Sequence, residues 1–248
     1  MRKATALVLA LVFALYASFA YTATAGKTDN SPDWFYLASF AKAKYNKPIV
    51  VRDTDSALGR YCLETKEIGL KDLARIHGHA CDGLVIAFVE IKAALNKLFP
   101  EGVVDRTDLR VVSKNGPCWV DTATMMTGAR INFKTLKIDK AIGDGFIIQR
   151  ISTGEAYDVH LKPGVFPADQ AALEGKIRAA RGKGDPVSAQ DIDTVEKMAD
   201  ALSLKLPSTP PDKLLDLKKV ESFQFSPNDT VDVFGNRGDV INKDMSRK

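Results

Sequence analysis

The stretch from residue 81 to Pro100 constrains the fold most, because its apolar residues recur with the period of an α-helix. They stand three or four residues apart: Leu84, Phe88, Ile91, Leu95 and Leu98. Side chains at this spacing share one face of a helix, and such an apolar face packs against other elements. The sequence therefore predicts an amphipathic helix over residues 84–98, ending at Pro100.

Alternating strand and helix signals surround this helix. Upstream, residues 33–45 space apolar side chains along one helix face, residues 49–51 indicate a short strand, and residues 71–75 a short helix. The elements predicted downstream are a strand at 108–113, a helix at 117–128, strands at 133–138, 145–151 and 155–162, and helices at 168–184 and 188–205. A connector with a short strand is expected at 207–225.

The first 25 residues are typical of a secretory signal peptide. Arg2 and Lys3 precede an apolar run over residues 4–20, and the small residues 23–25 stand before Gly26. We expect cleavage near Gly26 and export to the periplasm or the outside of the cell, with an uncleaved anchor as the alternative. No other segment is apolar enough to span a bilayer, so no membrane attachment is expected after cleavage.

The charge balance argues against a nucleic-acid partner. The chain has 35 basic and 31 acidic residues, and removal of Arg2 and Lys3 lowers the net charge from +4 to about +2. No block of basic residues is interleaved with aromatic ones. Walker A, G-x-S-x-G and C-x-x-C motifs are also missing from the sequence, which removes three common routes to chemistry.

The stretch "IHGHACDG", residues 76–83, gathers His77, His79 and Cys81 in a chain with three His and three Cys. An odd number of cysteines in an exported protein is compatible with one disulfide and a free thiol. Metal ligation is the alternative, because thiolates and imidazoles are the ligands that zinc prefers.

Cys81 and Cys118 each stand just before a predicted helix. Unpaired amides and the positive end of the helix dipole favour a thiolate at such a position. If the two helix starts converge, His79, Cys81 and Cys118 form a nitrogen and sulfur site for zinc or another thiophilic transition metal. Three ligands would leave one coordination position open.

His77 and Asp121 are the candidate catalytic proton carriers beside this site. His77 is alternatively a further ligand or a solvated loop residue, and Asp121 an acid stabilised by the helix N-terminus. Cys62 has no ligand-type neighbour and is expected to be a buried or spare thiol. His160 alternates with apolar residues on a strand and is expected on its solvent-facing side.

Three stretches of this chain together resemble the FmdE family, named for the FmdE component of formylmethanofuran dehydrogenase. They are "HGHACDG", "NGPCWVDTATMMTGARINF" and "IDKAIGDGFIIQRISTGEAYDVHL". The family pattern is H-G-H-x-C-P-G, then a Cys followed three residues later by Asp, then T-G. The resemblance spans about residues 70–165 and extends less specifically to about residue 224. It implies an α+β fold with a thioredoxin-like core, a mixed β-sheet flanked by helices, a homodimer and a metal-binding active site.

The family's motif residues map onto single positions of this chain. The matches are His77, His79 and Cys81 in the first motif, and Cys118 and Asp121 in the second. Three departures stand out: Asp82 replaces the usual Pro, residues 129–132 differ from the family's stretch, and no cysteine follows Cys118, so the C-terminal zinc finger of some members is missing. Export also argues against cytoplasmic formylmethanofuran chemistry.

The sequence thus predicts five parts. They are a signal peptide at 1–25, an N-terminal extension at 26–70, an FmdE-like core at 71–165, a helical extension with a dimer contact at 166–224, and a polar tail at 225–248. The leading hypothesis is an exported metal-binding protein that acts on a small molecule or handles a metal ion, and the sequence leaves open whether it is an enzyme. Two alternatives remain: a thiol redox protein that cycles a Cys81–Cys118 disulfide, and a non-catalytic binding module.

Overall fold

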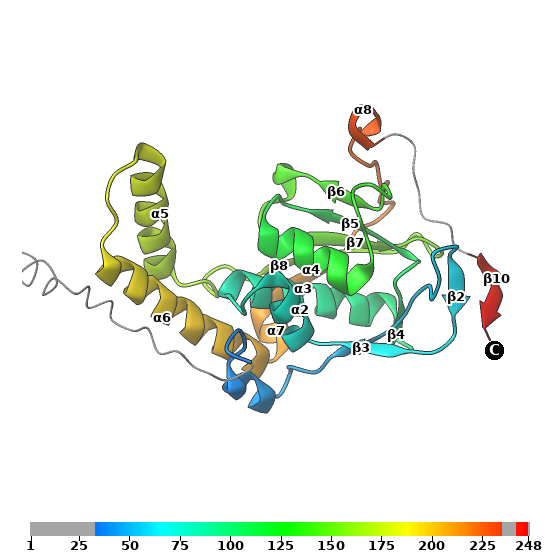
Figure 1. The fold of residues 1–248 in the computed structure, drawn as a ribbon, viewed down its shortest axis with the longest axis horizontal. Helices are drawn as coiled ribbons and strands as arrows, with labels where there is room; N and C mark the ends of the chain where they lie inside the picture. The colour runs from blue at the N-terminus through cyan, green and yellow to red at the C-terminus, as the bar shows by residue number, and fades with distance from the viewer. Residues whose placement is uncertain (1–32, 235–241, 248) are drawn as a thin grey trace, which may run out of the picture. The chain divides into compact units, whose positions relative to one another are not determined.

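The structure is a computed structural model that describes residues 33–234 and 242–247 (Figure 1). Residues 35–248 belong to one compact unit; residues 1–34 form another, of which Asp33 and Trp34 alone are described. The predicted signal peptide lies outside the described residues. Among the helices that are described, none has the length and apolar character needed to cross a membrane.

A five-stranded mixed sheet forms one layer of the core, in the order β6-β5-β7-β8-β9 (Figure 1). Its strands are β5 (Leu109–Ser113), β6 (Leu136–Ile138), β7 (Phe146–Arg150), β8 (Ala156–Leu161) and β9 (Leu215–Lys219). β5 runs parallel to β6, whereas β7, β8 and β9 are antiparallel to their neighbours. Strands β5, β6, β7 and β8 lie within strands predicted from the sequence, and β9 lies in the stretch 207–225 that was predicted as a connector followed by a short strand.

A second, three-stranded mixed sheet has the order β3-β1-β4. Strand β1 (Ile49–Arg52) runs antiparallel to β3 (Lys66–Ile68) and parallel to β4 (Val103–Asp105). Strand β2 (Arg60–Cys62) pairs in parallel with β10 (Asn242–Arg247), which lies in the predicted polar tail after α8 (Val231–Phe234).

Helix α3 (Asp82–Leu98) packs on the five-stranded sheet through contacts with β7, β8 and β9. The apolar residues that predicted this helix are at most 1% exposed: Leu84, Phe88, Ile91, Leu95 and Leu98. Burial of each such side chain stabilises the fold by about 1.5–3 kcal/mol. The predicted helix is confirmed and begins two residues earlier, at Asp82.

Two further helices pack against α3. They are α2 (Leu70–His77) and α4 (Pro117–Thr127), and they also contact each other. Pro117 occupies the first turn of α4 as predicted, and Gly128 ends the helix in the left-handed conformation with φ of 74°. The N-terminal ends of α3 and α4 and the C-terminal end of α2 carry the candidate site residues.

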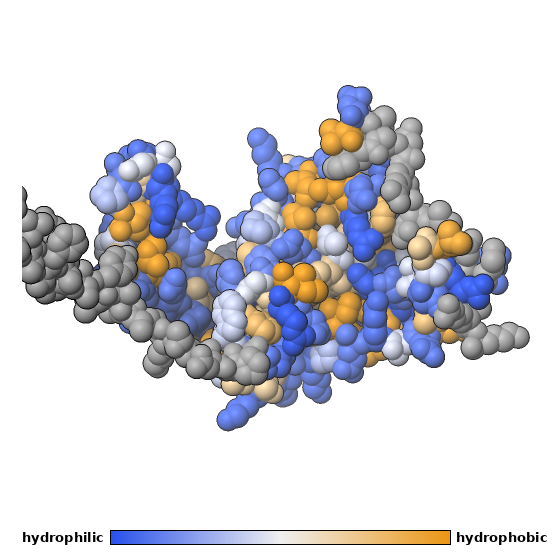
Figure 2. All heavy atoms as spheres, viewed as in Figure 1, coloured by the Kyte–Doolittle hydropathy of each residue, from blue (hydrophilic) through white to orange (hydrophobic). Residues whose placement is uncertain are grey.

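The two helices predicted after the core strands are present as a helix pair, here named the arm. It comprises α5 (Ala168–Lys183) and α6 (Ala189–Lys205), followed by the 3₁₀ helix η3 (Leu206–Ser208) and α7 (Pro211–Leu214). α6 contacts α3, and α5 contacts α6 at a steep angle (Figure 1). A strip of apolar atoms runs along α5 between polar ones (Figure 2). The predicted cap of α6 is present, since the Ser188 hydroxyl accepts a hydrogen bond from the Asp191 amide.

The helix predicted over residues 33–45 is wrong. The segment forms only a short 3₁₀ helix, η1 (Ala38–Lys42), in which the Ala43 amide donates to the Phe40 carbonyl. The Asn46 side chain also donates to the Phe40 carbonyl and to the Tyr36 hydroxyl, so a side chain takes a partner that an α-helix would need. Strands β2, β3 and β4 were missed because each is short and its partners are distant in sequence.

The predicted α+β class is confirmed. Mixed β-sheets are flanked by helices, and a helical extension precedes the last strand of the larger sheet. The 3₁₀ helix η2 (Lys140–Ile142) connects β6 to β7 in that sheet.

Candidate metal centre

Two of the predicted site residues are placed by the turn between α2 and α3. His77 is the last residue of α2, and Cys81 is the N-cap of α3. Gly78, between them, has φ of 112°, a conformation that favours glycine because it has no Cβ. The turn therefore brings the His77 ring and the Cys81 sulfur to the same side.

Cys118 reaches this turn from the first turn of α4 because α3 and α4 approach closely. A Cβ atom at Gly83 would lie 3.0 Å from the Cys118 sulfur and 3.3 Å from ring carbon Cζ3 of Trp119. These are tighter than ordinary van der Waals contacts, so only a glycine lets Cys118 take this position without a shift. The family pattern has a glycine at the same place, and its packing role was not evident from the sequence.

The His77 ring and the two sulfurs converge on one point. The Cys81 and Cys118 sulfurs are 3.4 Å apart, and His77 Nε2 lies 3.9 Å from the former and 3.7 Å from the latter. A tetrahedral metal with bonds of about 2.0–2.3 Å holds its ligand atoms about 3.3–3.8 Å apart. The three donor atoms therefore fit a zinc-type ion without rearrangement of the helices.

Asp121 fixes the orientation of the His77 ring. Its carboxylate oxygen Oδ2 lies 2.8 Å from His77 Nδ1. When Nδ1 carries the proton and donates to this carboxylate, Nε2 presents its lone pair to the two sulfurs. The His77 side chain is 6% exposed and the Asp121 side chain 45% exposed, so the ring is enclosed while its partner meets solvent. The structure thus places His77 with the donor atoms and Asp121 behind it.

His79 completes a group of donors with His77 and Cys81. The ligand atoms of these three residues lie within 4.8 Å of one another, and the rings of His77 and His79 are 5.5 Å apart. Unlike His77, His79 is exposed to solvent. It is therefore the donor best placed to leave or rejoin the site.

The negative charge of the cysteine pair is favoured on Cys81. The Cys118 thiol and the Leu84 amide both donate hydrogen bonds to its sulfur, and these bonds, with the nearby histidines, lower the pKa of Cys81. The same sulfur contact raises the pKa of Cys118. The N-terminus of α3 further favours a thiolate at this position. The lowered pKa favours the thiolate on Cys81, a ligand suited to a thiophilic ion.

The arm helix α5 reaches the site through Asp82. The Gln170 amide donates to the Asp82 carboxylate at 2.6 Å and to the Glu174 carboxylate at 3.0 Å. Gln170 is fully buried, and its carbonyl oxygen has no hydrogen-bond partner among the described residues. Asp82, which replaces the usual Pro of the family pattern, is thus held by a residue 88 positions away, and no sequence signal indicated this link.

Cys62 and His160 lie elsewhere. Cys62 is a half-buried free thiol on β2. His160 on β8 contacts the Asp144 carbonyl and the Asp158 carboxylate, at 2.6 and 2.5 Å. Neither belongs to the donor group that the described residues form around His77.

Comparison with known proteins gives one family and a distant structural likeness. The family model FmdE, described as "Molybdenum formylmethanofuran dehydrogenase operon", matches residues 76–216. A solved structure of a tungsten formylmethanofuran dehydrogenase (FmdE)-like protein from Syntrophus aciditrophicus is 16% identical; the match covers 65% of this chain and 76% of that one, with a TM-score of 0.34. No curated protein matches the chain.

Proposed function

This chain belongs to the FmdE family, and from that premise we propose that it binds a thiophilic transition metal, with zinc as the preferred ion. Its ligands are His77, Cys81 and Cys118, with His79 as an exchangeable fourth donor. The observation that carries the proposal is the approach of His77 Nε2 and both sulfurs to within 3.9 Å of one another. The sequence-based set of His79, Cys81 and Cys118 is thereby extended by His77.

The use of the metal follows from the contrast between the two histidines. When bound, such an ion polarises a carbonyl or lowers the pKa of a bound water. An enclosed His77 held by Asp121 is suited to permanent ligation, whereas an exposed His79 is suited to yielding its place to a small molecule or to passing the ion on. We therefore assign the protein to metal-dependent chemistry on a small molecule or to metal handling. Asp121 holds the Nδ1 proton of His77 in either case.

Export and dimerisation belong to the same proposal. The signal-like residues 1–25 support export to the periplasm or beyond, and recovery of a chain that begins near Gly26 tests it. The helical extension at 166–224 supplies the proposed homodimer contact. Light scattering that shows only monomer across micromolar concentrations would contradict the proposed homodimer.

Metal content of anaerobically purified protein tests the ligand set. We expect about one metal ion per chain in the wild type and little in Cys118→Ser or His77→Ala, because a hydroxyl is a far poorer soft ligand than a thiolate and a methyl group has no donor atom. His79→Ala should keep the ion but release it faster to a chelator. Asp121→Asn should lower the affinity about 10–100-fold, the usual effect of losing a ligand's carboxylate partner.

The matched control is Cys62→Ser, which removes a thiol outside the donor group and should leave metal content unchanged. Equal metal content in wild type and Cys118→Ser would contradict the proposal. So would a wild type that takes up no metal on anaerobic loading with zinc.

A thiol redox function is the second candidate, favoured by the 3.4 Å separation of the Cys81 and Cys118 sulfurs. Both cysteines are free, and a disulfide would need the sulfurs to approach to about 2.05 Å. Formation of that bond releases two electrons and two protons to an oxidant such as an acceptor disulfide. A thiol count that falls by two on mild oxidation in the metal-loaded protein would favour this function over metal binding. Protection of both thiols by bound metal would favour the metal site.

A further inference from the structure

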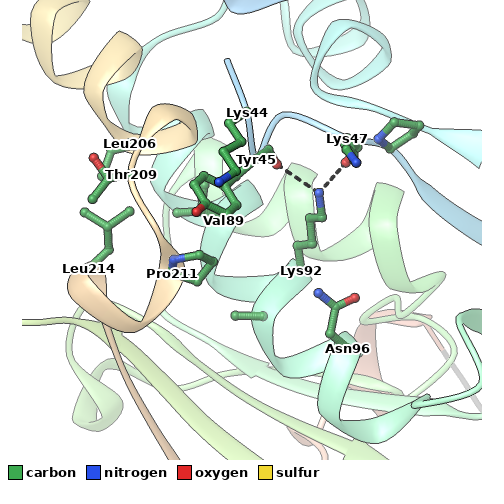
Figure 3. A pocket seen from close by; sticks show the side chains of 12 residues that line it. Lys44, Tyr45, Lys47, Val89, Lys92, Asn96, Leu206, Thr209, Pro211 and Leu214 are labelled. Atoms are coloured by element: carbon green, nitrogen blue, oxygen red, sulfur yellow. Dashed lines mark hydrogen bonds between the residues drawn. The ribbon is translucent and has the colours of Figure 1, made fainter. Parts of the chain in front are cut away.

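A cavity of about 420 Å³ lies beside the C-terminal half of α3. Figure 3 shows the side chains that line it, and none of them belongs to the metal site. Its walls come from α3, from residues 44–48, from η3 and from α7. Lys92, on the α3 wall, stands eleven residues after Cys81, or about 16 Å farther along the helix axis. The size is typical of sites for small molecules, about 300–1,000 Å³.

The cavity lining is cationic. Lys44, Lys47 and Lys92 line it, and none of the described lining residues is acidic. Within the described part of the chain, these three lysines have no ion pair with a carboxylate. Three positive charges without a counter-charge favour an anionic occupant.

Lys92 is the best placed of the three to meet an anion. Its Nζ donates to the carbonyl of Tyr45 at 3.0 Å and to that of Lys47 at 2.5 Å (Figure 3). An ammonium group has three donors, so one remains. Partial burial and the charge of Lys47 lower the pKa of Lys92 to about 8. A bound carboxylate would offset both effects.

The remaining walls are largely apolar. The apolar lining residues are Pro48, Val89, Ala93, Leu206, Pro211 and Leu214. They suit a hydrocarbon body, and burial of each CH₂ group of such a body contributes about 0.8 kcal/mol. A free inorganic anion would leave these walls without a partner.

We propose that this cavity binds a small organic monocarboxylate with an apolar body. The carboxylate pairs with Lys92 and Lys47, and the body packs on Val89, Ala93 and Leu214. The site is independent of the metal centre, because no described lining residue belongs to the donor group around His77. The inference therefore goes beyond the proposed function.

Calorimetric titration of the full chain with octanoate tests this site, with acetate, octanol and inorganic phosphate as comparison probes. We expect saturable, one-to-one binding of octanoate and at least tenfold weaker binding of the other three. Lys92→Met should weaken octanoate binding at least tenfold. Lys97→Met is the matched control, since it removes the same charge from the same helix at a position outside this lining, and it should change binding less than twofold.

Lys92 also anchors residues 44–47 through its backbone hydrogen bonds, so its replacement affects folding as well as binding. A second variant therefore separates the two effects. Ala93→Phe keeps Lys92 and fills the cavity, and it should abolish octanoate binding while thermal melting stays near the wild type. Octanoate binding no tighter than that of octanol, acetate or phosphate would overturn the proposal. Equal losses in Lys92→Met and Lys97→Met, or wild-type binding by Ala93→Phe, would overturn it too.

Discussion

Helices α3 and α5 are nearly equal in length, yet they are stabilised differently. α3 has 17 residues, of which 12 are buried, whereas α5 has 16 residues and buries only Gln170. α3 is held by tertiary packing against sheet and helices; α5 depends on α6 and on one hydrogen bond to Asp82. The metal site therefore rests on the most strongly packed helix, and the arm is attached to it by a few contacts.

The largest difference should come from truncation of one apolar side chain in each helix. Phe88→Ala removes a ring that is 0% exposed, and we expect a loss of about 3–5 kcal/mol in unfolding free energy. Leu173→Ala in α5 removes a half-buried side chain and should cost about 1 kcal/mol. Urea unfolding measures both. Equal losses of unfolding free energy in the two variants would contradict the proposed difference between α3 and α5.

A glycine-to-alanine pair should give effects of opposite sign. Gly83→Ala places a Cβ 3.0 Å from the Cys118 sulfur, and overpacking of this kind costs about 1–3 kcal/mol. Gly175→Ala in α5 meets no described atom within 4 Å and should stabilise the protein by about 0.5–1 kcal/mol. Gly83→Ala should also lower metal content, because Cys118 must move. A stable Gly83→Ala variant with full metal content would show that α3 and α4 separate easily.

The hydrogen bond that links α5 to the start of α3 is expected to contribute less to stability than the packing changed in the variants above. Gln170→Leu removes the hydrogen bond to the Asp82 carboxylate and should cost about 1.5 kcal/mol. This is the low end for bonds to charged groups, because the change also removes a buried oxygen that has no partner in the described part of the chain. Hydrogen exchange should rise in α5 but not in α3. Increased exchange throughout α3 would mean that the arm supports the core.

Among these substitutions, Glu90→Gln changes the shape of the side chain least, and its effect on the unfolding free energy depends on pH. Glu90 is 1% exposed on α3; it accepts a hydrogen bond from the Leu161 amide and faces Lys114, Asp144 and Asp158. Burial, with the two carboxylates, raises the pKa of Glu90 well above 4.5, so the folded state holds a proton that the unfolded state releases. Stability should therefore fall as pH rises above 4.5, up to the raised pKa.

In Glu90→Gln this fall should disappear, so the variant gains on the wild type as the pH rises above 4.5. Glu174→Gln in α5 is the matched control: Glu174 is partly exposed beside Arg178, and its replacement should change the unfolding free energy by about 0.5 kcal/mol or less. Unfolding free energies measured across this pH range decide the matter. Identical pH profiles for wild type and Glu90→Gln would refute the prediction.

The longer helices and most strands could be predicted because their signals are local. The spacing of Leu84, Phe88 and Leu95 predicted α3, and Pro117 and Gly128 marked the ends of α4. The prediction failed at residues 33–45, where the Asn46 side chain takes a backbone partner. Strands as short as β2 and β3 carry too few residues for an alternating pattern, and they form through partners elsewhere in the chain.

The site was partly predictable for the same reason. The types and spacing of His77, His79 and Cys81 indicated metal chemistry, and the position of Cys118 at a helix start indicated a reactive thiol. The roles of the two histidines did not follow from spacing. Only the fold shows His77 enclosed against Asp121 and both sulfurs, and His79 at the surface.

By itself, the sequence determined the longer helices, most strands of the larger sheet and the donor atoms that are available, since periodicity, caps and side-chain chemistry act over a few residues. Tertiary structure decided which donors meet, that Gln170 reaches Asp82, and that three lysines line one largely apolar cavity. These contacts join residues dozens of positions apart. Their distances depend on how α3 packs against α4, the arm and the N-terminal segment, and close packing of side chains such as the Gly83–Cys118 contact sets that arrangement.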